Sequence, residues 1–207
     1  MRQGILPTLL RYFDRLVYKL FRQELCRVET SEADFSEIVL REDYETRSIT
    51  SQDFHESLCS ELMEADYREA FCRGDVCIAS LRGRKVVGYT FYTNKPTPVN
   101  EAVSFMFNQD YLYNYASATA TEHRGNKLEA QRWKVGQMEQ VKVAGVDSPR
   151  IFYKNVVNFE SRATGRGYEN GFLGYALIFR IANRWFCWNS PGCVRAETGF
   201  FNCKGDS

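Results

Sequence analysis

The segment 111–128 (YLYNYASATATEHRGNKL) constrains the fold of this chain more than any other. It begins as a run of aromatic and small residues, which favours a strand. The pair Arg124-Gly125 follows without a linker, and residues 128–141 are compatible with a helix. A strand that turns directly into a helix brings unpaired backbone N–H groups together at the positive end of the helix dipole. The sequence therefore predicts an anion site at this turn, suited to a pyrophosphate.

Further strands are predicted on both sides of this segment. Residues 76–81 and 86–92 are apolar runs that flank Arg82-Gly83-Arg84-Lys85, which predicts a hairpin with a glycine-containing turn. Residues 150–157 predict another strand, and residues 173–181 (LGYALIFRI) predict a buried one.

The turn motif resembles that of the GNAT superfamily, the acyl-CoA-dependent N-acyltransferases. In that family a strand ends in a segment like V-x-P-x-[HY]-R-G-x-G, whose backbone amides hold the CoA pyrophosphate. Residues 119–127 (TATEHRGNK) match the Arg-Gly core and the His before it. They depart from the motif at Thr121, where Pro is common, and at Lys127, where a second Gly is common. The second departure matters because Gly lets a backbone approach a ligand closely.

Features downstream extend the resemblance to about residues 30–185. The sequence 158–161 (NFES) is similar to the family's N-x-x-S/A helix start, with Asn158 as a sound N-cap. Gly167-Tyr168 or Gly171-Phe172 then stands where the family has Gly-Phe. The resemblance implies an α/β fold of the α+β type, in which helices flank a mixed, mainly antiparallel central sheet.

The resemblance also implies acetyl-CoA or another acyl-CoA as co-substrate and no metal. Turn residues would surround the pyrophosphate, mainly through backbone amides, and the end of the strand would face the pantetheine and the thioester. The start of the later helix would touch the pantetheine arm or the adenosine-side phosphate. The turn residues implied are Arg124, Gly125, Asn126, Lys127 and Leu128. The residues at the end of the strand are Thr119 and Ala120, and those at the start of the later helix are Asn158 and Ser161.

The activity implied is direct transfer of an acyl group from CoA to a primary amine, on a small molecule or a peptide. Many family members carry a Glu base on the strand; here Glu122, at the strand's end, is the nearest carboxylate. Tyr168 is the candidate acid, because a Tyr near the later helix often protonates the thiolate in the family. Alternatively, Glu122 is a first-turn carboxylate favoured by the helix dipole, and Tyr168 is a core aromatic.

Charge is distributed unevenly along a chain of 207 residues with a net charge of +1. This balance excludes a strongly basic nucleic-acid-binding protein. Residues 29–70 hold thirteen acidic and three basic residues, whereas residues 124–166 hold nine basic and four acidic ones. The basic stretch coincides with the predicted anion site. The acidic stretch either attracts an amine substrate or is the solvated face of helices.

Seven scattered cysteines with no signal peptide before them indicate reduced thiols and a cytoplasmic protein. Cys187, Cys193 and Cys203 cluster near the C-terminus but lack the paired C-x-x-C spacing or a nearby His of a zinc site. The only two histidines, His55 and His123, belong to no recognisable triad or metal pattern.

The N-terminal segment 1–28 is predicted to be a separate amphipathic helical segment, and residues 29–207 one compact domain. Basic residues lie between its apolar positions, so it is not the ~20-residue apolar span that crosses a bilayer. Through residues 5–22 it either docks on the domain, pairs with a second copy, or lies on an anionic membrane surface. The apolar positions are Leu6, Leu9, Leu10, Phe13, Leu16, Val17, Leu20 and Phe21, and the basic ones Arg11, Arg15, Lys19 and Arg22.

Two other functions keep the same fold. The chain is alternatively a catalytically inactive acyl-CoA-binding or interaction module, since the strand Glu and the second Gly are absent. A membrane-docked acyltransferase acting on a lipid-linked acceptor is the third hypothesis, and it rests on the N-terminal segment alone.

Overall fold

The computed structural model describes residues 24–31, 38–62, 67–108, 111–144, 150–155, 170–181 and 184–203. The chain forms two compact units. The first, here called the turn unit, comprises residues 31–95 and 109–152. The second, the terminal unit, comprises residues 1–30, 96–108 and 153–207.

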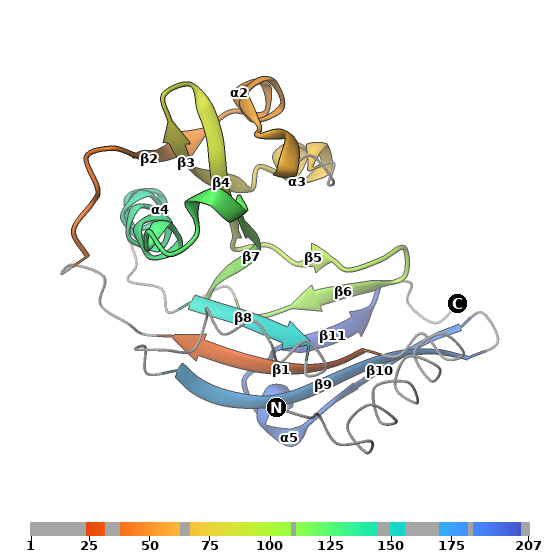
Figure 1. Ribbon diagram of the computed structural model, residues 1–207. Helices are drawn as coiled ribbons and strands as arrows, with labels where there is room; N and C mark the ends of the chain where they lie inside the picture. The colour runs from red at the N-terminus through yellow and green to blue at the C-terminus, as the bar shows by residue number, and fades with distance from the viewer. Residues whose placement is uncertain are drawn as a thin grey trace, which may run out of the picture. The chain divides into compact units, whose positions relative to one another are not determined.

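The turn unit is built on strands in the order β8-β7-β4-β3-β2, of which β8 contributes its first residues (Figure 1). Neighbouring strands run antiparallel, except that β7 and β8 run parallel. The strands are β2 (Glu45–Ile49), β3 (Val76–Arg82), β4 (Lys85–Thr93), β7 (Leu112–Thr119) and β8 (Arg150–Asn155). The helices are α2 (Ser51–Ser57), η1 (Ser60–Leu62), α3 (Arg68–Arg73), η2 (Thr121–His123) and α4 (Leu128–Ala144).

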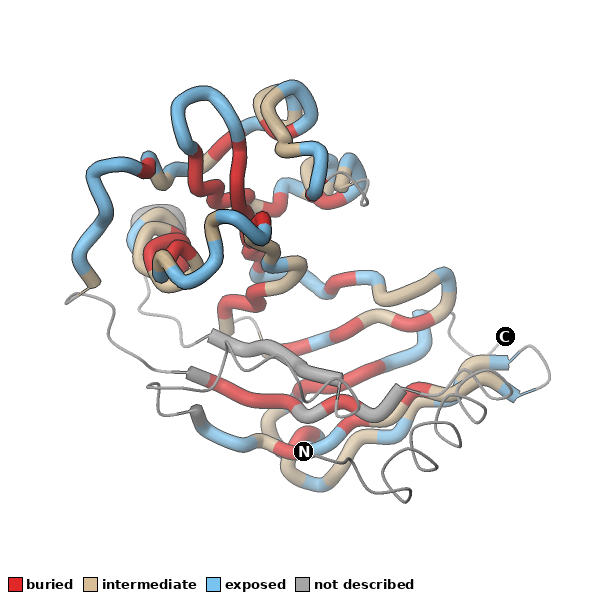
Figure 2. The backbone as a smooth tube through the Cα atoms, viewed as in Figure 1, coloured by how far each residue is buried: buried red, intermediate tan, exposed pale blue. Residues whose placement is uncertain are grey.

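The hairpin β3–β4 forms the centre of this sheet. Every residue of β4 from Val86 to Thr93 is buried (Figure 2). A strand buried on both faces reads as a continuous apolar run rather than an alternating one. This is why the sequence predicted the hairpin correctly.

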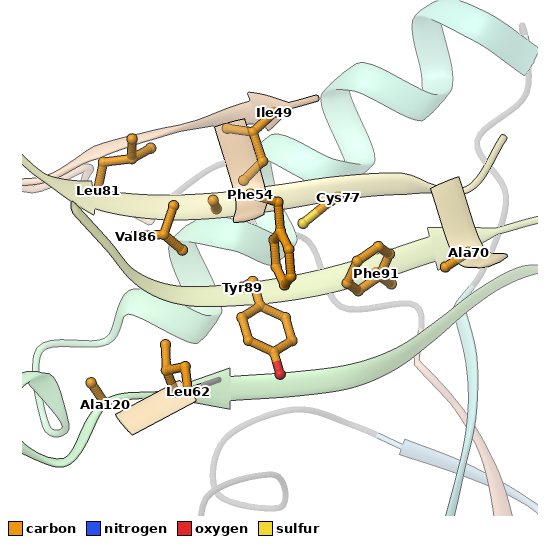
Figure 3. Close-up of a cluster of buried hydrophobic side chains, with 11 residues drawn as sticks. Ile49, Phe54, Leu62, Ala70, Cys77, Leu81, Val86, Tyr89, Phe91 and Ala120 are labelled. Atoms are coloured by element: carbon orange, nitrogen blue, oxygen red, sulfur yellow. The ribbon is translucent and has the colours of Figure 1, made fainter. Parts of the chain in front are cut away.

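One face of the sheet packs against α2, η1 and α3 through a hydrophobic cluster (Figure 3). Phe54 of α2 is fully buried at its centre and packs edge-on against Tyr89 and Phe91 of β4. The Thr50 side chain begins α2 by accepting a hydrogen bond of 3.1 Å from the amide of Asp53. Thus a capped helix of two turns holds an aromatic anchor over the central strand.

The other face packs against α4, where Arg132 lies fully buried. Its guanidinium donates to Oγ of Ser80 on β3, Oγ1 of Thr90 on β4, and both Oγ1 of Thr119 and the carbonyl of Ala118 on β7, at 2.9–3.2 Å. No described carboxylate pairs with this guanidinium. Burial lowers the pKa of Arg132, because the charged form has lost its hydration.

The terminal unit contains two sets of strands. β1 (Glu24–Ser31) lies next to β9 (Asn170–Ile181), which pairs antiparallel with β10 (Arg184–Asn189). β5 (Thr97–Pro98), β6 (Val103–Met106) and β11 (Gly199–Asn202) form a three-stranded sheet. The short helix α5 (Pro191–Arg195) follows β10, and the Asn189 side chain bonds both the amide and the carbonyl of Phe200 at 2.9 Å.

The predicted fold class is confirmed. The structure is α+β, with a mixed and mainly antiparallel sheet flanked by helices. The predicted hairpin, the strand before the turn, the helix from Leu128 and the strands near 150 and 173–181 are all present. The last strand was predicted as buried, but in β9 buried and partly exposed residues alternate, because one of its faces is not covered by described residues.

The boundary predicted between residues 28 and 29 falls inside β1. Cys26, Val28, Glu29 and Thr30 are buried within this strand. Residues 24–28 are therefore strand rather than helix. The predicted helix over residues 5–22 lies outside the described residues. None of the described helices is long and apolar enough to cross a membrane.

We expect Arg132→Lys to destabilise the protein more than Arg132→Met. Lysine keeps a desolvated charge but cannot reach acceptors on three strands at once. Methionine fills a similar volume without a charge, so it loses the hydrogen bonds but also the desolvation penalty. Arg132→Lys should lower the free energy of unfolding by about 3 kcal/mol and Arg132→Met by less. Urea unfolding of the three proteins measures this order, and a Met variant weaker than the Lys variant would contradict it.

Candidate functional site: the turn between β7 and α4

The turn after β7 presents a row of backbone amides at the start of α4. Within the described part of the chain, no acceptor lies on the amides of the six residues from Gly125 to Ala130. Gly125 has a φ of +81°, and no atom lies within 4 Å of the position its Cβ would occupy. The 17-residue helix α4 adds the positive end of its dipole to these amides. The arrangement can bind an anion through the backbone alone.

Lys127 takes a left-handed conformation, with a φ of +56°. This is a conformation that glycine adopts freely and that costs other residues about 1–2 kcal/mol. The turn motif that this segment resembles commonly has its second Gly at the position of Lys127. The side chain differs from the motif, but the backbone at Lys127 has the conformation that a glycine would favour.

Side chains from the segment before β2 brace the turn. Arg41 donates to the side-chain carbonyl of Asn126 at 2.9 Å and also pairs with Asp43. The Tyr44 hydroxyl shares a hydrogen bond of 3.0 Å with Nδ1 of His123. The Asn126 side chain in turn donates to the carbonyl of His123 at 3.0 Å. The turn is thus held in shape by its own residues and by a distant segment.

A carboxylate already binds at the end of β7. Glu61 of η1 accepts hydrogen bonds from the amide of Thr121 at 3.0 Å and from the Thr121 hydroxyl. The hydrogen bond from that hydroxyl, followed by that from the amide, lowers the pKa of Glu61, which is exposed. Sequence reasoning missed Glu61 because it lies 60 residues before its partner, and nothing local marks it.

β7 has one paired edge and one edge that is largely open. β8 pairs with β7 only at Leu112 and Tyr113. From Asn114 to Thr119, no described strand pairs with that edge. On the other edge, Thr90 of β4 faces two residues of β7, which forms a bulge at Ala116 with a φ of +50°. Among the described residues, this edge of the strand that leads to the turn thus has no strand partner beyond Tyr113.

The residues at the end of β7 are engaged within the protein. The hydroxyl of Thr119 accepts from Arg132 at 2.9 Å, and its carbonyl accepts from Nε of Arg124 at 3.1 Å. Ala120 is buried in the hydrophobic cluster, and its amide donates to the carbonyl of Val87 at 2.9 Å. Their side chains thus face the protein interior rather than an open site.

Of the two candidate catalytic residues, the structure describes Glu122 but not Tyr168. Glu122 is an exposed residue of η2, before the first turn of α4, and it makes no hydrogen bond through its carboxylate to any described residue. Tyr168 lies outside the described residues, and so do Asn158 and Ser161. The structure therefore brings together the turn residues 124–128 and the strand end, but does not describe the later helix.

A buried cluster that sequence reasoning missed lies on the other face of β7. Asp75, with a fully buried side chain, accepts from Arg73 at 2.6 Å and from the Tyr115 hydroxyl at 2.5 Å. Arg73 also donates to the Tyr115 hydroxyl at 3.0 Å. Desolvation, then the hydrogen bond to Asp75, raises the pKa of Tyr115 above its ordinary value. Tyr115 is therefore a neutral donor that anchors β7 to α3, and not a base.

A second carboxylate near β7 comes from the first turn of α4. Glu129 accepts a hydrogen bond of 3.3 Å from the hydroxyl of Ser117. Ser117 also shares a hydrogen bond of 3.0 Å with Thr90.

Among the described residues, no three His, Cys, Asp or Glu side chains gather closely enough to hold a metal ion.

No protein-family model matches the sequence, and no curated protein matches it. The chain is similar to a solved Drosophila protein at 15% identity and a TM-score of 0.47, over 86% of this chain and 59% of that one. It is similar to a tandem GNAT protein from the clavulanic acid biosynthesis pathway at 14% identity and a TM-score of 0.42, over 64% of this chain and 45% of that one.

A functionally unknown conserved protein from Staphylococcus epidermidis is similar at 10% identity and a TM-score of 0.44, over 87% of this chain and 68% of that one. The chain spans less than two thirds of the length of the Drosophila protein and of the tandem GNAT protein.

The Tyr115–Asp75 hydrogen bond predicts a stability that depends on alkaline pH. The pKa of Tyr115 is raised in the folded state. The protonated Tyr115 therefore makes its full contribution to the free energy of unfolding below pH ~10, and this contribution is lost as the pH rises further. We expect Tyr115→Phe to be about 1–2 kcal/mol less stable than the wild type at pH 8. The difference should shrink by about 1.4 kcal/mol per pH unit above pH ~10.

Urea unfolding at several pH values measures this difference. Tyr111→Phe, a matched change just before β7, serves as the control. A difference between the wild type and Tyr115→Phe that stays constant up to pH 11 would show that Asp75 does not hold the Tyr115 proton.

Proposed function

We propose that the turn between β7 and α4 binds an acyl-CoA and that the chain is an acyl-CoA-dependent N-acyltransferase. One observation carries the proposal: an edge of β7 that pairs with no described strand beyond Tyr113 leads directly into six amides that donate to no described acceptor. CoA has the matching order of groups, since its pantetheine arm carries amides and ends in a pyrophosphate. The arm can pair with a strand edge as a peptide does, while the pyrophosphate binds the helix start.

The residues of the turn would have separate roles. Gly125, Asn126, Lys127 and Leu128 would donate backbone amides to the pyrophosphate, and Arg124 would lie beside it as a cation. The bulge at Ala116 supports this assignment, because it takes one residue of β7 out of the ladder and leaves its backbone groups free for a thioester. Asn158 and Ser161 remain proposed contacts of the pantetheine arm or the adenosine-side phosphate.

The reaction proposed is direct transfer to a primary amine. The neutral amine nitrogen attacks the thioester carbonyl carbon, so that a C–N bond forms and the C–S bond breaks. The nitrogen loses a proton to a base, and the departing thiolate takes one from an acid. The protein would contribute mainly by holding the two reactants together and by donating hydrogen bonds to the carbonyl oxygen.

The acid and the base are proposed from position in the chain. Tyr168 is the proposed acid and Glu122 the proposed base. Asp75 is a poor alternative, since its side chain is fully buried and is paired with Arg73. The exposed position of Glu122 leaves its carboxylate accessible to a water or an amine.

Gly125→Glu should abolish acyl-CoA binding. The new side chain would strain a backbone with a φ of +81° and would place a negative charge beside the pyrophosphate. We expect the affinity for acetyl-CoA to fall by about 100-fold or more, as for the loss of two charge-assisted hydrogen bonds. Calorimetric titration of both proteins measures this change.

Gly83→Glu is the matched control. Gly83 lies in the β3–β4 turn with a φ of +61° and, like Gly125, has no atom within 4 Å of its would-be Cβ. It introduces the same strain and charge away from the site, so affinity should stay within about threefold of the wild type. If wild-type protein binds neither acetyl-CoA nor a longer acyl-CoA, the proposal is wrong. Binding without turnover for any amine would instead identify a binding module.

Tyr168→Phe and Glu122→Gln test the two proposed catalytic roles. A true acid or base contributes about 10²- to 10⁴-fold to the rate, so each variant should lower kcat by that order. The Glu122 variant should also lose the acidic limb of the pH–rate profile, and the Tyr168 variant the alkaline limb. An unchanged kcat across the pH range would remove the residue from the mechanism, while acyl-CoA affinity, measured separately, reports on the turn.

A further inference from the structure

One face of the β9–β10 pair in the terminal unit is apolar and exposed. Because opposed residues of antiparallel strands share a face, the register places these side chains together. Phe179 and Phe186 are opposed and their rings stack at 5.3 Å, while Leu177 faces Trp188. We call this surface the outer face, formed by Tyr175, Leu177, Phe179, Ile181, Phe186 and Trp188, with Arg184 opposite Ile181 at its edge.

The outer face exposes several large apolar side chains. Ile181 is 48% exposed, Phe186 41% and Trp188 50%. The opposite face of β9 is covered, as shown by the buried Ala176 and Ile178. A contiguous apolar patch of this kind marks a contact surface.

We propose that residues 5–22 of this chain form a helix that packs on the outer face. This inference does not depend on the proposed function. With 3.6 residues per turn, the eight apolar positions from Leu6 to Phe21 named above fall within an arc of about 140°. The four basic residues fall within an arc of about 80° on the opposite side. Such a helix would bury its apolar side on the sheet and keep its cations in water.

The connection to the sheet favours this occupant. Only residue 23 separates the segment from β1, which begins at Glu24 and lies next to β9. In Figure 1, β1 runs opposite to β9, so that it begins at the end of the sheet where β9 ends near Ile181. The segment therefore starts from the edge of the surface it would cover. A tether this short gives it an effective local concentration on the order of millimolar, which a second copy lacks.

The dimensions of the two surfaces also agree. From Leu6 to Phe21, a helix rises about 22 Å at 1.5 Å per residue. From Tyr175 to Ile181, the outer face extends about 20 Å at 3.3 Å per residue. One helix therefore spans the exposed part of β9 and β10 without leaving an apolar end uncovered. A helix lying on a membrane would leave the outer face without a cover.

Photo-crosslinking in the full-length chain tests this packing. The variant Phe186→p-benzoylphenylalanine places a crosslinker on the outer face, and Val194→p-benzoylphenylalanine places one on α5, where Val194 is 59% exposed. We expect the first to crosslink within the same chain to residues 5–22, as mapped by mass spectrometry. The second should give at least tenfold less of this product.

Changes in the segment itself provide the matched controls. Leu9→Glu, Phe13→Glu and Val17→Glu together put charge on the apolar side, and should lower the crosslink from position 186 by at least tenfold. Arg11→Glu, Arg15→Glu and Lys19→Glu put three glutamates on the basic side, with twice the change in net charge, and should leave the crosslink intact. Circular dichroism checks that each variant is folded. If the first triple variant is unfolded, the proposal is judged from the crosslinks of the chain that carries only the Phe186 substitution.

Two results would overturn the proposal. A product joining two chains, with a dimer by light scattering, would make a second copy the occupant. No crosslink to residues 5–22, with the protein sedimenting on phosphatidylserine vesicles at low salt, would make a membrane surface the partner of the segment.

Discussion

The fold of the turn unit depends on one buried guanidinium. Arg132 of α4 donates to β3, β4 and β7, so a single side chain fixes the helix against three strands. All of its described hydrogen-bond acceptors are neutral oxygens, and these, together with the charge of Glu129, oppose a desolvation cost of several kcal/mol. The site of this guanidinium leaves no spare room, since a Cβ at Gly88 would lie 2.5 Å from it. Packing at this point is therefore specific rather than merely apolar.

That constraint determines where the candidate site lies. Two of the acceptors of Arg132, the Thr119 hydroxyl and the Ala118 carbonyl, are the last groups of β7 before the turn. The same helix whose start supplies the free amides thus also clamps the strand that leads into them. The conformation of the turn is then set from both sides, with Arg41 and Tyr44 bracing Asn126 and His123. A backbone anion site needs such rigidity, because its donors are not free to adjust to the ligand.

The sequence was informative where structure follows from nearby residues. The apolar runs of β3 and β4 and the strand-to-helix transition at Arg124-Gly125 are local patterns, and they predicted the hairpin and the position of the turn between β7 and α4 correctly. The left-handed Lys127 and the contacts of Glu61 with Thr121 and Asp75 with Tyr115 could not be predicted this way. They depend on chain segments 40 to 60 residues apart, or on a conformation that tertiary contacts impose against local preference. The helical reading of residues 24–28 failed because these residues belong to a strand in which a charged residue, Glu29, is buried beside apolar ones.

The contact between Glu61 and Thr121 supports an anion site by an argument independent of the motif. Glu61 is exposed and has water as an alternative partner, yet its carboxylate lies on the amide and hydroxyl that follow β7. The pKa of Glu61 is lowered by those two hydrogen bonds and by the charge of Arg124, so this position favours a negative group over a neutral one. The amides without acceptors begin four residues later, at Gly125, and have the dipole of α4 behind them as well. Because Glu61 bonds, among the described residues, only to Thr121, it leaves the amides from Gly125 onward to the pyrophosphate of the proposed ligand.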